Sequence, residues 1–254
     1  MAYIVAGDPA VEITVKLMHV LVEAGVDIIE LGVPFSDPEA EGPVIQLAHE
    51  RALQTNGNRR AVSLKDTFSI VAKFREIDDV TPIILMGYVN PIEIMGYETF
   101  AKTASQAGVD GTIIVNLPPE EAGSLTAALE ENEIDSVYLL APTTTDERAA
   151  FITSRSRGFV YYVSLKGTTG ASSLDVGDVK EKLSRFRSIS NLPIMVGFGI
   201  KDAETAAKVA AISDGVVVGS AIVQLIADNL DEPEAGMKKI TELISGMRKS
   251  IDES

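Results

Sequence analysis

Cysteine and tryptophan are both absent from this chain of 254 residues. Without cysteine, the chain forms no disulfide, offers no thiolate to a metal ion and has no cysteine nucleophile. Histidine occurs only at His19 and His49, and both positions fall in helical patterns where ordinary packing or surface roles are favoured. The side chains left for acid–base chemistry are therefore mainly carboxylates.

Long apolar runs and an excess of basic residues are also missing. No stretch reaches the roughly 18 apolar residues of a membrane span, and no signal-peptide pattern opens the chain. The formal net charge of −15 disfavours nucleic acid or an anionic membrane as a partner. With 46% hydrophobic residues the chain can bury one sizeable core, and we expect a cytoplasmic protein.

Short β-rich apolar runs alternate with longer amphipathic stretches along the whole sequence. Several runs are apolar on both faces, as parallel strands covered by helices are. The strands are expected at 2–6, 27–31, 82–86, 111–115, 136–140, 159–163, 193–196 and 215–218. The clearest helices are expected at 11–23, 43–54, 64–75, 98–106, 119–130, 203–209 and 235–251.

Eight strands, each followed by a helix, are the content of a (β/α)₈ or TIM barrel of about 250 residues. We therefore predict an α/β fold in which residues 1–254 form a single barrel domain. A doubly wound sheet is the alternative, but it normally uses fewer strands, and no Gly-x-Gly-x-x-Gly follows the first strand.

Two helix-to-strand joints share the pattern Ala-Gly-Val-Asp, around Gly25 and Gly108. Glycine there suits a left-handed residue at the end of a helix. The repeat could reflect a duplicated half-barrel, but a shared solution to the same turn is favoured.

An acidic strand end marks the most informative segment. Glu30 follows Ile28 with the two-residue period of a strand, so it faces the barrel interior if Ile28 does. In this fold active sites lie at the C-terminal ends of the strands. An apolar setting raises a carboxyl pKa and makes the group a proton donor and acceptor near neutral pH. We therefore predict a catalytic Glu30, with pairing to a neighbouring loop as the alternative.

Glu41 lies in a different setting, directly before the Gly-Pro pair at 42–43, where proline suits the first position of a helix over 43–54. A carboxylate beside a helix N-terminus is stabilised by roughly 0.3–1 kcal/mol, so we expect Glu41 to stay ionised and to accept a hydrogen bond. Two carboxyl groups in such unlike settings suggest an acid–base pair, although a helix cap would also account for Glu41. A calcium loop starting at Asp37 is rejected because its twelfth residue is Ala48, and we predict no metal site.

A phosphate site is predicted at two neighbouring strand ends. The strand at 193–196 is followed by Gly199, and the strand at 215–218 by Gly219 and Ser220. Loops at these places in a barrel commonly bind phosphate, because glycine admits backbone N–H groups and a helix N-terminus favours an anion. Tight packing of small residues is the alternative.

The loop over 164–173 is small, rich in hydroxyl groups and punctuated by glycine, which suits a lid over a site. Lys166 within it raises the alternative of a Schiff-base mechanism, although its loop position argues against a lowered pKa. Tyr3, Tyr88, Tyr161 and Phe198 could line a flat apolar pocket, or serve ordinary barrel packing.

Taken together, these segments resemble the α-subunit of tryptophan synthase. The most specific piece is the sequence ELGVPFSDP at 30–38, and the match extends over nearly the whole chain. Further matching segments are AGDP at 6–9, MGYVNP at 86–91, LPPEE at 117–121, GTTG at 167–170 and GFG at 197–199.

The resemblance implies a lyase of tryptophan biosynthesis that cleaves indole-3-glycerol phosphate to indole and glyceraldehyde 3-phosphate. This retro-aldol-type reaction needs C3 of the indole protonated, its N1 proton held or removed, and a side-chain hydroxyl deprotonated. In the resemblance Glu30 matches the general acid/base, and Glu41 stands where the family usually has an aspartate that binds the indole N–H.

The resemblance also implies binding residues. Tyr161 matches a pocket tyrosine, and Thr169 matches a loop threonine that helps to organise the second carboxylate. The expected substrate pocket is completed by Tyr3, Tyr88 and Phe198. The family's phosphate-binding positions fall on Gly170, Gly199, Gly219 and Ser220.

A partner and its cofactor are implied as well. The family enzyme works as an α2β2 heterotetramer, in which a β-subunit carries pyridoxal phosphate and receives the indole; no cofactor is implied for this chain itself. The residues on the face that would meet the β-subunit are Asp37, Pro38, Asn90 and Pro118.

Three departures from the family pattern bear on these expectations. Glu41 is one methylene longer than aspartate, which shifts its carboxylate by roughly 1.5 Å, and misplacement on the order of 1 Å can cost about a hundredfold in rate. Asn116 stands where an aspartate is more common. The helix that normally precedes the first strand is missing from the sequence as given, so we expect a partly open barrel bottom and reduced stability.

The favoured function is therefore the indole-forming lyase, with two alternatives. One is another phosphate-handling barrel enzyme, either an aldolase acting through Lys166 or a sugar-phosphate isomerase. The other is a catalytically weak subunit that activates its partner, as the departures at Glu41 and Asn116 could indicate.

Overall fold

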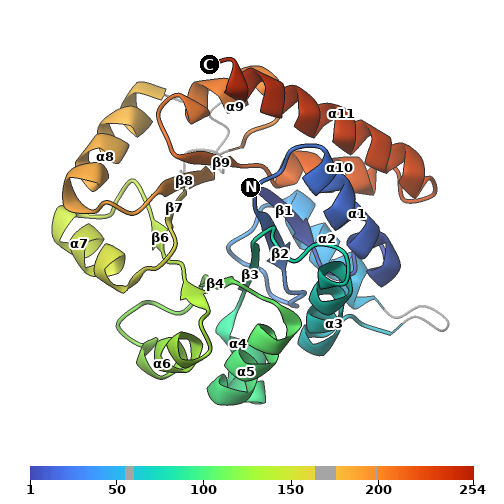
Figure 1. Cartoon of the computed structure of the whole chain (residues 1–254), viewed down its shortest axis with the longest axis horizontal. Coiled ribbons are helices and arrows are strands. Elements are labelled where there is room, and N and C mark those ends of the chain that lie inside the picture. The colour runs from blue at the N-terminus through green and yellow to red at the C-terminus, as the bar shows by residue number, and fades with distance from the viewer. Residues whose placement is uncertain (55–59, 164–175, 198) are drawn as a thin grey trace.

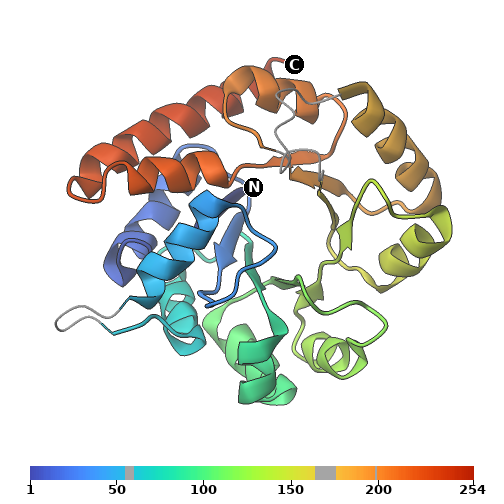
Figure 2. The same cartoon turned by 180° about the vertical axis from the view of Figure 1, so that it is seen from behind.

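Strands and helices alternate along the chain and build a ring of helices around central parallel strands (Figures 1 and 2). The computed structural model describes residues 1–54, 60–163, 176–197 and 199–254. The strands are β1 (Ala2–Val5), β2 (Ile29–Gly32), β3 (Ile83–Gly87), β4 (Gly111–Ile114), β5 (Asp135–Ser136), β6 (Leu139–Leu140), β7 (Val160–Val163), β8 (Ile194–Gly197) and β9 (Gly215–Val217). The helices are α1 (Val11–Glu23), α2 (Pro43–Leu53), α3 (Leu64–Arg75), α4 (Val89–Met95), α5 (Tyr97–Ala107), α6 (Gly123–Glu131), α7 (Asp146–Arg155), α8 (Val176–Ile189), α9 (Ala203–Ala210), α10 (Ser220–Ala227) and α11 (Pro233–Asp252).

The strands close into a barrel. Pairing runs in chain order from β1 to β5 and again from β6 to β9, with every pair parallel. β5 and β6 are two pieces of one strand: Val137 N–H still donates to a carbonyl of β4 at 2.9 Å, whereas Tyr138 O accepts from Tyr161 N–H of β7 at 3.1 Å. A bridge between Ala2 and Val218 joins the two ends. The predicted (β/α)₈ barrel is confirmed, and the doubly wound alternative is wrong.

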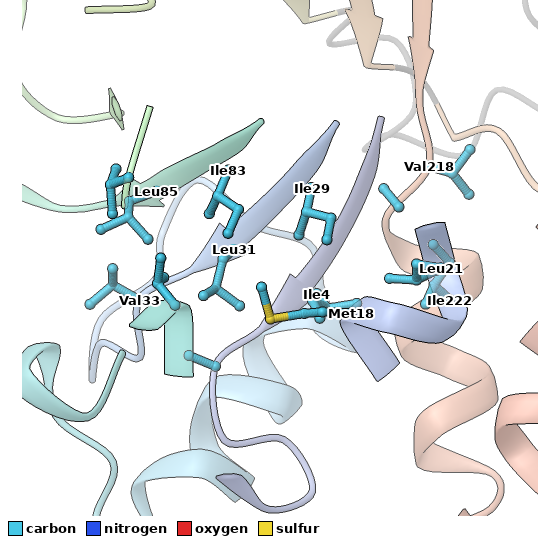
Figure 3. Close-up of a cluster of buried hydrophobic side chains, with 14 of the residues drawn as sticks. Ile4, Met18, Leu21, Ile29, Leu31, Val33, Ile83, Leu85, Val218 and Ile222 are labelled. Atoms are coloured by element: carbon cyan, nitrogen blue, oxygen red, sulfur yellow. The ribbon is translucent and has the colours of Figure 1, made fainter. Parts of the chain in front are cut away.

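Alternate residues of each strand serve two different cores. The outward residues, such as Ile29 and Leu31, are fully buried under the surrounding helices. Figure 3 shows this layer beside Met18 and Leu21 of α1. The inward residues fill the barrel with a second cluster: Met1, Ile84, Ile113, Val137, Phe159, Met195 and Val217. Because the barrel interior is packed, a site can form only toward an end of the strands.

Element boundaries differ from the prediction in a few places. The helix expected from residue 119 begins at Gly123, because Pro118 and Pro119 lead into a turn in which Glu121 N–H donates to Pro118 O at 3.0 Å. The expected strand at 136–140 is divided between two partners, as described above. Within the described ranges, no helix combines the length and the apolar character needed to cross a bilayer.

The N-terminal ends of the strands leave a cavity of about 390 Å³, lined by Met1, Ile28, Met195 and, from α11, Met247. The partly open barrel bottom and the loss of stability that we expect from the sequence both stay predictions.

Three helix-to-strand joints use the same backbone geometry. Gly25 and Gly108 have the positive φ angles predicted for them, 101° and 92°. In both joints the next N–H donates back to the carbonyl five residues earlier, from Val26 to Leu21 and from Val109 to Ala104. This is the Schellman closure of a helix.

The third joint makes the same closure without glycine. Ile134 N–H donates to Leu129 O at 3.0 Å, and Glu133 occupies the positive-φ position at 58°. A side chain in this region carries a steric penalty of roughly 1–2 kcal/mol. Glu133 is exposed, so its side chain provides little packing in return.

We predict that Glu133→Gly raises the free energy of unfolding by about 1 kcal/mol, because it removes this backbone strain. The matched control is Glu131→Gly, two residues earlier in α6, which should lower it by about 1 kcal/mol. Urea unfolding followed by circular dichroism measures both. A loss of stability in both variants would contradict the strain assigned to Glu133.

Candidate active site

Glu30 lies on β2 with its side chain inside the barrel. Its partners in register are Tyr3 on β1 and Ile84 on β3, and Ile28 packs in the interior cluster two residues earlier. The predicted inward phase is therefore confirmed. Glu30 is only 2% exposed, and its Oε2 atom is buried with no hydrogen-bond partner among the residues that the structure describes.

The electrostatic setting of Glu30 favours its protonated form. Burial raises the pKa of Glu30 from 4.5 to about 8; the α-ammonium of Met1 opposes this shift, and Glu41 adds to it. The carboxyl group therefore holds a proton at neutral pH while remaining able to release it. A shifted pKa of this kind, in a buried acid at the edge of a barrel, is typical of a functional site.

Glu41 comes from the loop between β2 and α2 and is 8% exposed. The Tyr88 hydroxyl, just after β3, donates to its Oε2 atom, whereas Oε1 is buried without a hydrogen bond from any described residue. Helix α2 starts at Pro43 with Gly42 as its N-cap and shows no side-chain cap. The expected hydrogen bond to Glu41 is present, but its donor is a phenol and not the start of the helix.

His49 of α2, for which an ordinary packing or surface role was expected, faces the same carboxylate. The Phe35 backbone N–H donates to Nδ1 at 3.1 Å. Nδ1 is thus an acceptor, which places the proton of the neutral imidazole on Nε2. Nε2 lies 3.2 Å from the Tyr3 hydroxyl and 3.6 Å from Glu41 Oε1.

A signal for His49 was available in the sequence. Ala48 and Ala52 lie on the buried face of α2 beside it and pack in one cluster with Tyr3. A polar ring between two small residues on a buried helix face needs partners. The sequence could not say that those partners come from β1 and from the loop between β2 and α2.

Two tyrosines lie over glycines of neighbouring strands. A Cβ atom on Gly32 would come within 2.9 Å of Tyr3 Cζ, and one on Gly197 within 2.7 Å of Tyr161 Cζ. Burial raises the pKa of both phenols, and the nearby carboxylates add to this effect, chiefly Glu41 for Tyr3 and Glu30 for Tyr161. Both phenols therefore keep their protons and serve as neutral polar groups.

The expected phosphate loops lie at the ends of β8 and β9. Gly199 is exposed with a φ of 23°, and Gly219 is the N-cap of α10, whose first turn holds no acidic residue. The first helical bonds run from Ile222 and Val223 N–H to Gly219 O, so they leave the N–H of Ser220 available. A Cβ on Gly219 would approach described atoms no closer than 3.4 Å, so tight packing does not explain this glycine.

Lys166, Thr169, Gly170 and Phe198 lie outside the described residues. The lid expected over 164–173 falls in the same gap.

The residues expected to meet a partner follow β2, β3 and β4, which are neighbours in the barrel. Asp37 and Pro38 lie on the loop after β2, Asn90 in the first turn of α4, and Pro118 on the loop after β4. Asp37, Asn90 and Pro118 are exposed, and Pro38 is half-buried.

Asn116 has a role in this loop cluster. Its Oδ1 accepts from Val89 N–H at 2.8 Å, at the start of α4, and its Nδ2 donates to Asn90 Oδ1 at 3.3 Å. An ionised aspartate at this position could accept the first bond but could not donate the second.

A closed (β/α)₈ barrel with two buried carboxyl groups toward the C-terminal ends of its strands has the build of a barrel enzyme. The sequence profile of the family described as "Tryptophan synthase alpha chain" matches residues 1–252. The chain belongs to this family. It is a carbon–carbon lyase that cleaves indole-3-glycerol phosphate in tryptophan biosynthesis.

Individual relatives agree with this assignment. The tryptophan synthase alpha chain of Thioalkalivibrio sulfidiphilus is 54% identical over 250 residues, which cover 98% of this chain and 92% of the relative. The crystal structure of the alpha subunit from Legionella pneumophila superposes with a TM-score of 0.91 at 46% identity, covering 100% and 92% of the two chains. A structure of the tryptophan synthase α2β2 complex from Pyrococcus furiosus matches with a TM-score of 0.87 at 38% identity, covering 97% and 96%.

The raised pKa of Glu30 predicts a specific pH dependence of stability. Between 4.5 and about 8 the folded chain binds a proton at Glu30 that the unfolded chain has released, so the free energy of unfolding falls as the pH rises through this window. Between pH 6 and pH 9 we expect the free energy of unfolding to fall by about 2–3 kcal/mol more in wild type than in Glu30→Gln, because one pKa unit is worth about 1.4 kcal/mol. Urea unfolding of both proteins at the two pH values measures this. Parallel pH curves would rule out the raised pKa.

Proposed function

We propose that Glu30 and Glu41 form the acid–base pair with which this chain splits indole-3-glycerol phosphate into indole and glyceraldehyde 3-phosphate. One observation carries this proposal: each side chain has one buried carboxylate oxygen without a hydrogen-bond partner among the described residues. The two groups also interact electrostatically. Leaving a buried polar atom unpaired costs about 1–3 kcal/mol, and a substrate that supplies the missing partner accounts for its retention.

The protonated Glu30 is the general acid. Its proton passes to C3 of the indole ring, and the ring nitrogen then carries the positive charge. Glu41 accepts the N1–H through its free Oε1 atom and stabilises that charge. Glu30, now ionised, takes the proton of the hydroxyl group on the adjacent side-chain carbon.

Bond cleavage follows from these proton positions. The hydroxyl oxygen becomes the aldehyde oxygen of glyceraldehyde 3-phosphate, and the electrons of the broken carbon–carbon bond return to the indole ring. Glu30 ends the cycle protonated as it began, so no net proton is consumed. The pair therefore accounts for the whole reaction without Lys166, which makes the Schiff-base alternative unnecessary.

The remaining predicted residues bind the substrate in this proposal. Tyr3 and Tyr161, whose phenols stay protonated, flank the indole ring together with Tyr88; Thr169 and Phe198 complete the pocket from segments outside the described residues. The phosphate group is held by the N-terminus of α10 and the loop after β8, through Gly199, Gly219 and Ser220, with Gly170 from the loop after β7.

The partner surface is also part of the proposal. The segments after β2, β3 and β4 meet a β-subunit in an α2β2 complex, through Asp37, Pro38, Asn90 and Pro118. A structural relative from Pyrococcus furiosus forms an α2β2 complex, which supports this assignment. We place pyridoxal phosphate on the β-subunit and the single-domain chain in the cytoplasm.

We predict that Glu30→Gln lowers kcat for indole release by about 10²–10⁴-fold, because a positioned general acid contributes on that order. The measurement is indole formation from indole-3-glycerol phosphate, with and without a tryptophan synthase β-subunit. Unchanged stimulation of the β-subunit by the variant would show that the fold survives. Retention of wild-type kcat would refute the role of Glu30, and absence of turnover in the wild type together with stimulation would favour the activating-subunit alternative.

A second prediction concerns the phosphate end of the site. Ser220→Asp places a carboxylate at the first position of α10. A negative charge at this position stabilises the helix by roughly 0.3–1 kcal/mol. The variant should therefore unfold no earlier than wild type but should show a KM raised by about tenfold or more, through repulsion of the substrate phosphate. An unchanged KM would count against phosphate binding at α10.

A further inference from the structure

We propose that His49 is a positioning residue that holds the carboxylate of Glu41 in place, so that Glu41 Oε1 is presented to the indole N–H. The inference rests on the proposed function, in which Glu41 is the acceptor for that N–H. It adds a residue from α2 to a site otherwise built from strand ends, loops and the N-terminus of α10.

The imidazole of His49 has a fixed orientation. His49 is 1% exposed, and its Nδ1 atom accepts the backbone N–H of Phe35 at 3.1 Å. A backbone donor cannot be turned away without moving the loop, so the ring has a single orientation and a single neutral tautomer. The N–H at Nε2 must then point into the barrel, toward Tyr3 and Glu41.

The two carboxylate oxygens of Glu41 have different partners. Oε2 is bound by the Tyr88 hydroxyl, whereas Oε1 lies 3.6 Å from His49 Nε2, beyond the range of a hydrogen bond. The N–H at Nε2 attracts Oε1 without occupying it, because its hydrogen-bond partner is the Tyr3 hydroxyl at 3.2 Å. Oε2 is thus fixed by a hydrogen bond, whereas Oε1 is oriented by His49 but accepts no hydrogen bond from a described residue.

The length of the Glu41 side chain matches the positions of these partners. Tyr88 follows β3 and His49 lies on α2, so the Glu41 carboxylate contacts side chains from two different elements. An aspartate in this loop would place its carboxylate roughly 1.5 Å nearer the backbone and would lose one of the two contacts. The Tyr88–His49 pair therefore fits the glutamate found here.

A purely structural role for His49 makes a different prediction, because its bond to Phe35 involves only Nδ1. His49→Asn keeps an acceptor near the position of Nδ1 and removes the donor at Nε2. His49→Gln reaches far enough to keep a donor near Nε2. The matched control is His19→Asn, which alters the other histidine, stacked on Phe74 at 4.6 Å outside the barrel.

The experiment measures indole release by the full-length chain in complex with a tryptophan synthase β-subunit. We expect His49→Asn to lower kcat by about 10- to 100-fold with KM changed less than about threefold, because misplacement of a catalytic group on the order of 1 Å has this effect. His49→Gln should recover most of the loss, and His19→Asn should match wild type. Activity of His49→Asn within about twofold of wild type, or equal losses in the Asn and Gln variants, would overturn the proposal.

A binding readout does not depend on turnover. Because the chain contains no tryptophan, the fluorescence of added indole can be followed without background from that residue. Wild type should prefer indole over 1-methylindole, which lacks the N–H, by about tenfold or more, as expected for a hydrogen bond to a charged group. This preference should shrink to about twofold in His49→Asn and persist in both His49→Gln and His19→Asn; an undiminished preference in His49→Asn would contradict the positioning role.

The two proposals fail separately. An active Glu30→Gln enzyme would refute the acid–base pair, while the indole preference would still report on His49 and Glu41. An inactive Glu30→Gln enzyme together with a fully active His49→Asn enzyme would leave the pair intact and remove His49 from the mechanism.

Discussion

The site depends on strand β2, in which adjacent residues face two different environments, the outer core under the helices and the interior of the barrel. Ile29 and Leu31 are fully buried under the helices, and Glu30 between them points into the barrel. A shift of the strand by one residue would exchange these faces and place a carboxyl group in the outer core. The hydrophobic contacts of Ile29 and Leu31 therefore hold Glu30 in its low-dielectric position, and that position raises its pKa.

The second carboxylate is controlled in another way. Glu41 is on a loop, where no alternating pattern dictates its direction, and its orientation comes from polar contacts with Tyr88 and His49. Both partners accept backbone N–H groups of the loop that carries Glu41: Ala40 N–H donates to the Tyr88 hydroxyl at 3.0 Å, and Phe35 N–H donates to His49. One acid is thus positioned by packing and the other by polar contacts, which gives the two groups different chemistry.

Periodicity was sufficient to predict the parts of the fold that are repeated. The strand pattern predicted the barrel, the phase relative to Ile28 predicted the direction of Glu30, and glycine in the joints predicted the positive φ of Gly25 and Gly108. The divided fifth strand was not predictable from its own residues, because its halves are defined by bonds to different neighbours. His49 was missed for the same reason: Ala48 and Ala52 mark a buried helix face, but the groups opposite that face belong to other elements, namely β1 and the loop between β2 and α2.

The close approach of Tyr3 to Gly32 also constrains how this site can change over generations. The tyrosine ring occupies the space that any side chain at position 32 would need. A larger residue can therefore replace Gly32 only after Tyr3 has been replaced by a smaller one. In the reverse order, the first substitution produces a protein in which the two side chains clash. Since the Tyr3 hydroxyl also bonds to His49, losing that ring removes a partner of His49. Evolutionary drift at an apparently simple glycine is thereby tied to the geometry of the carboxylate on the other side of the pocket.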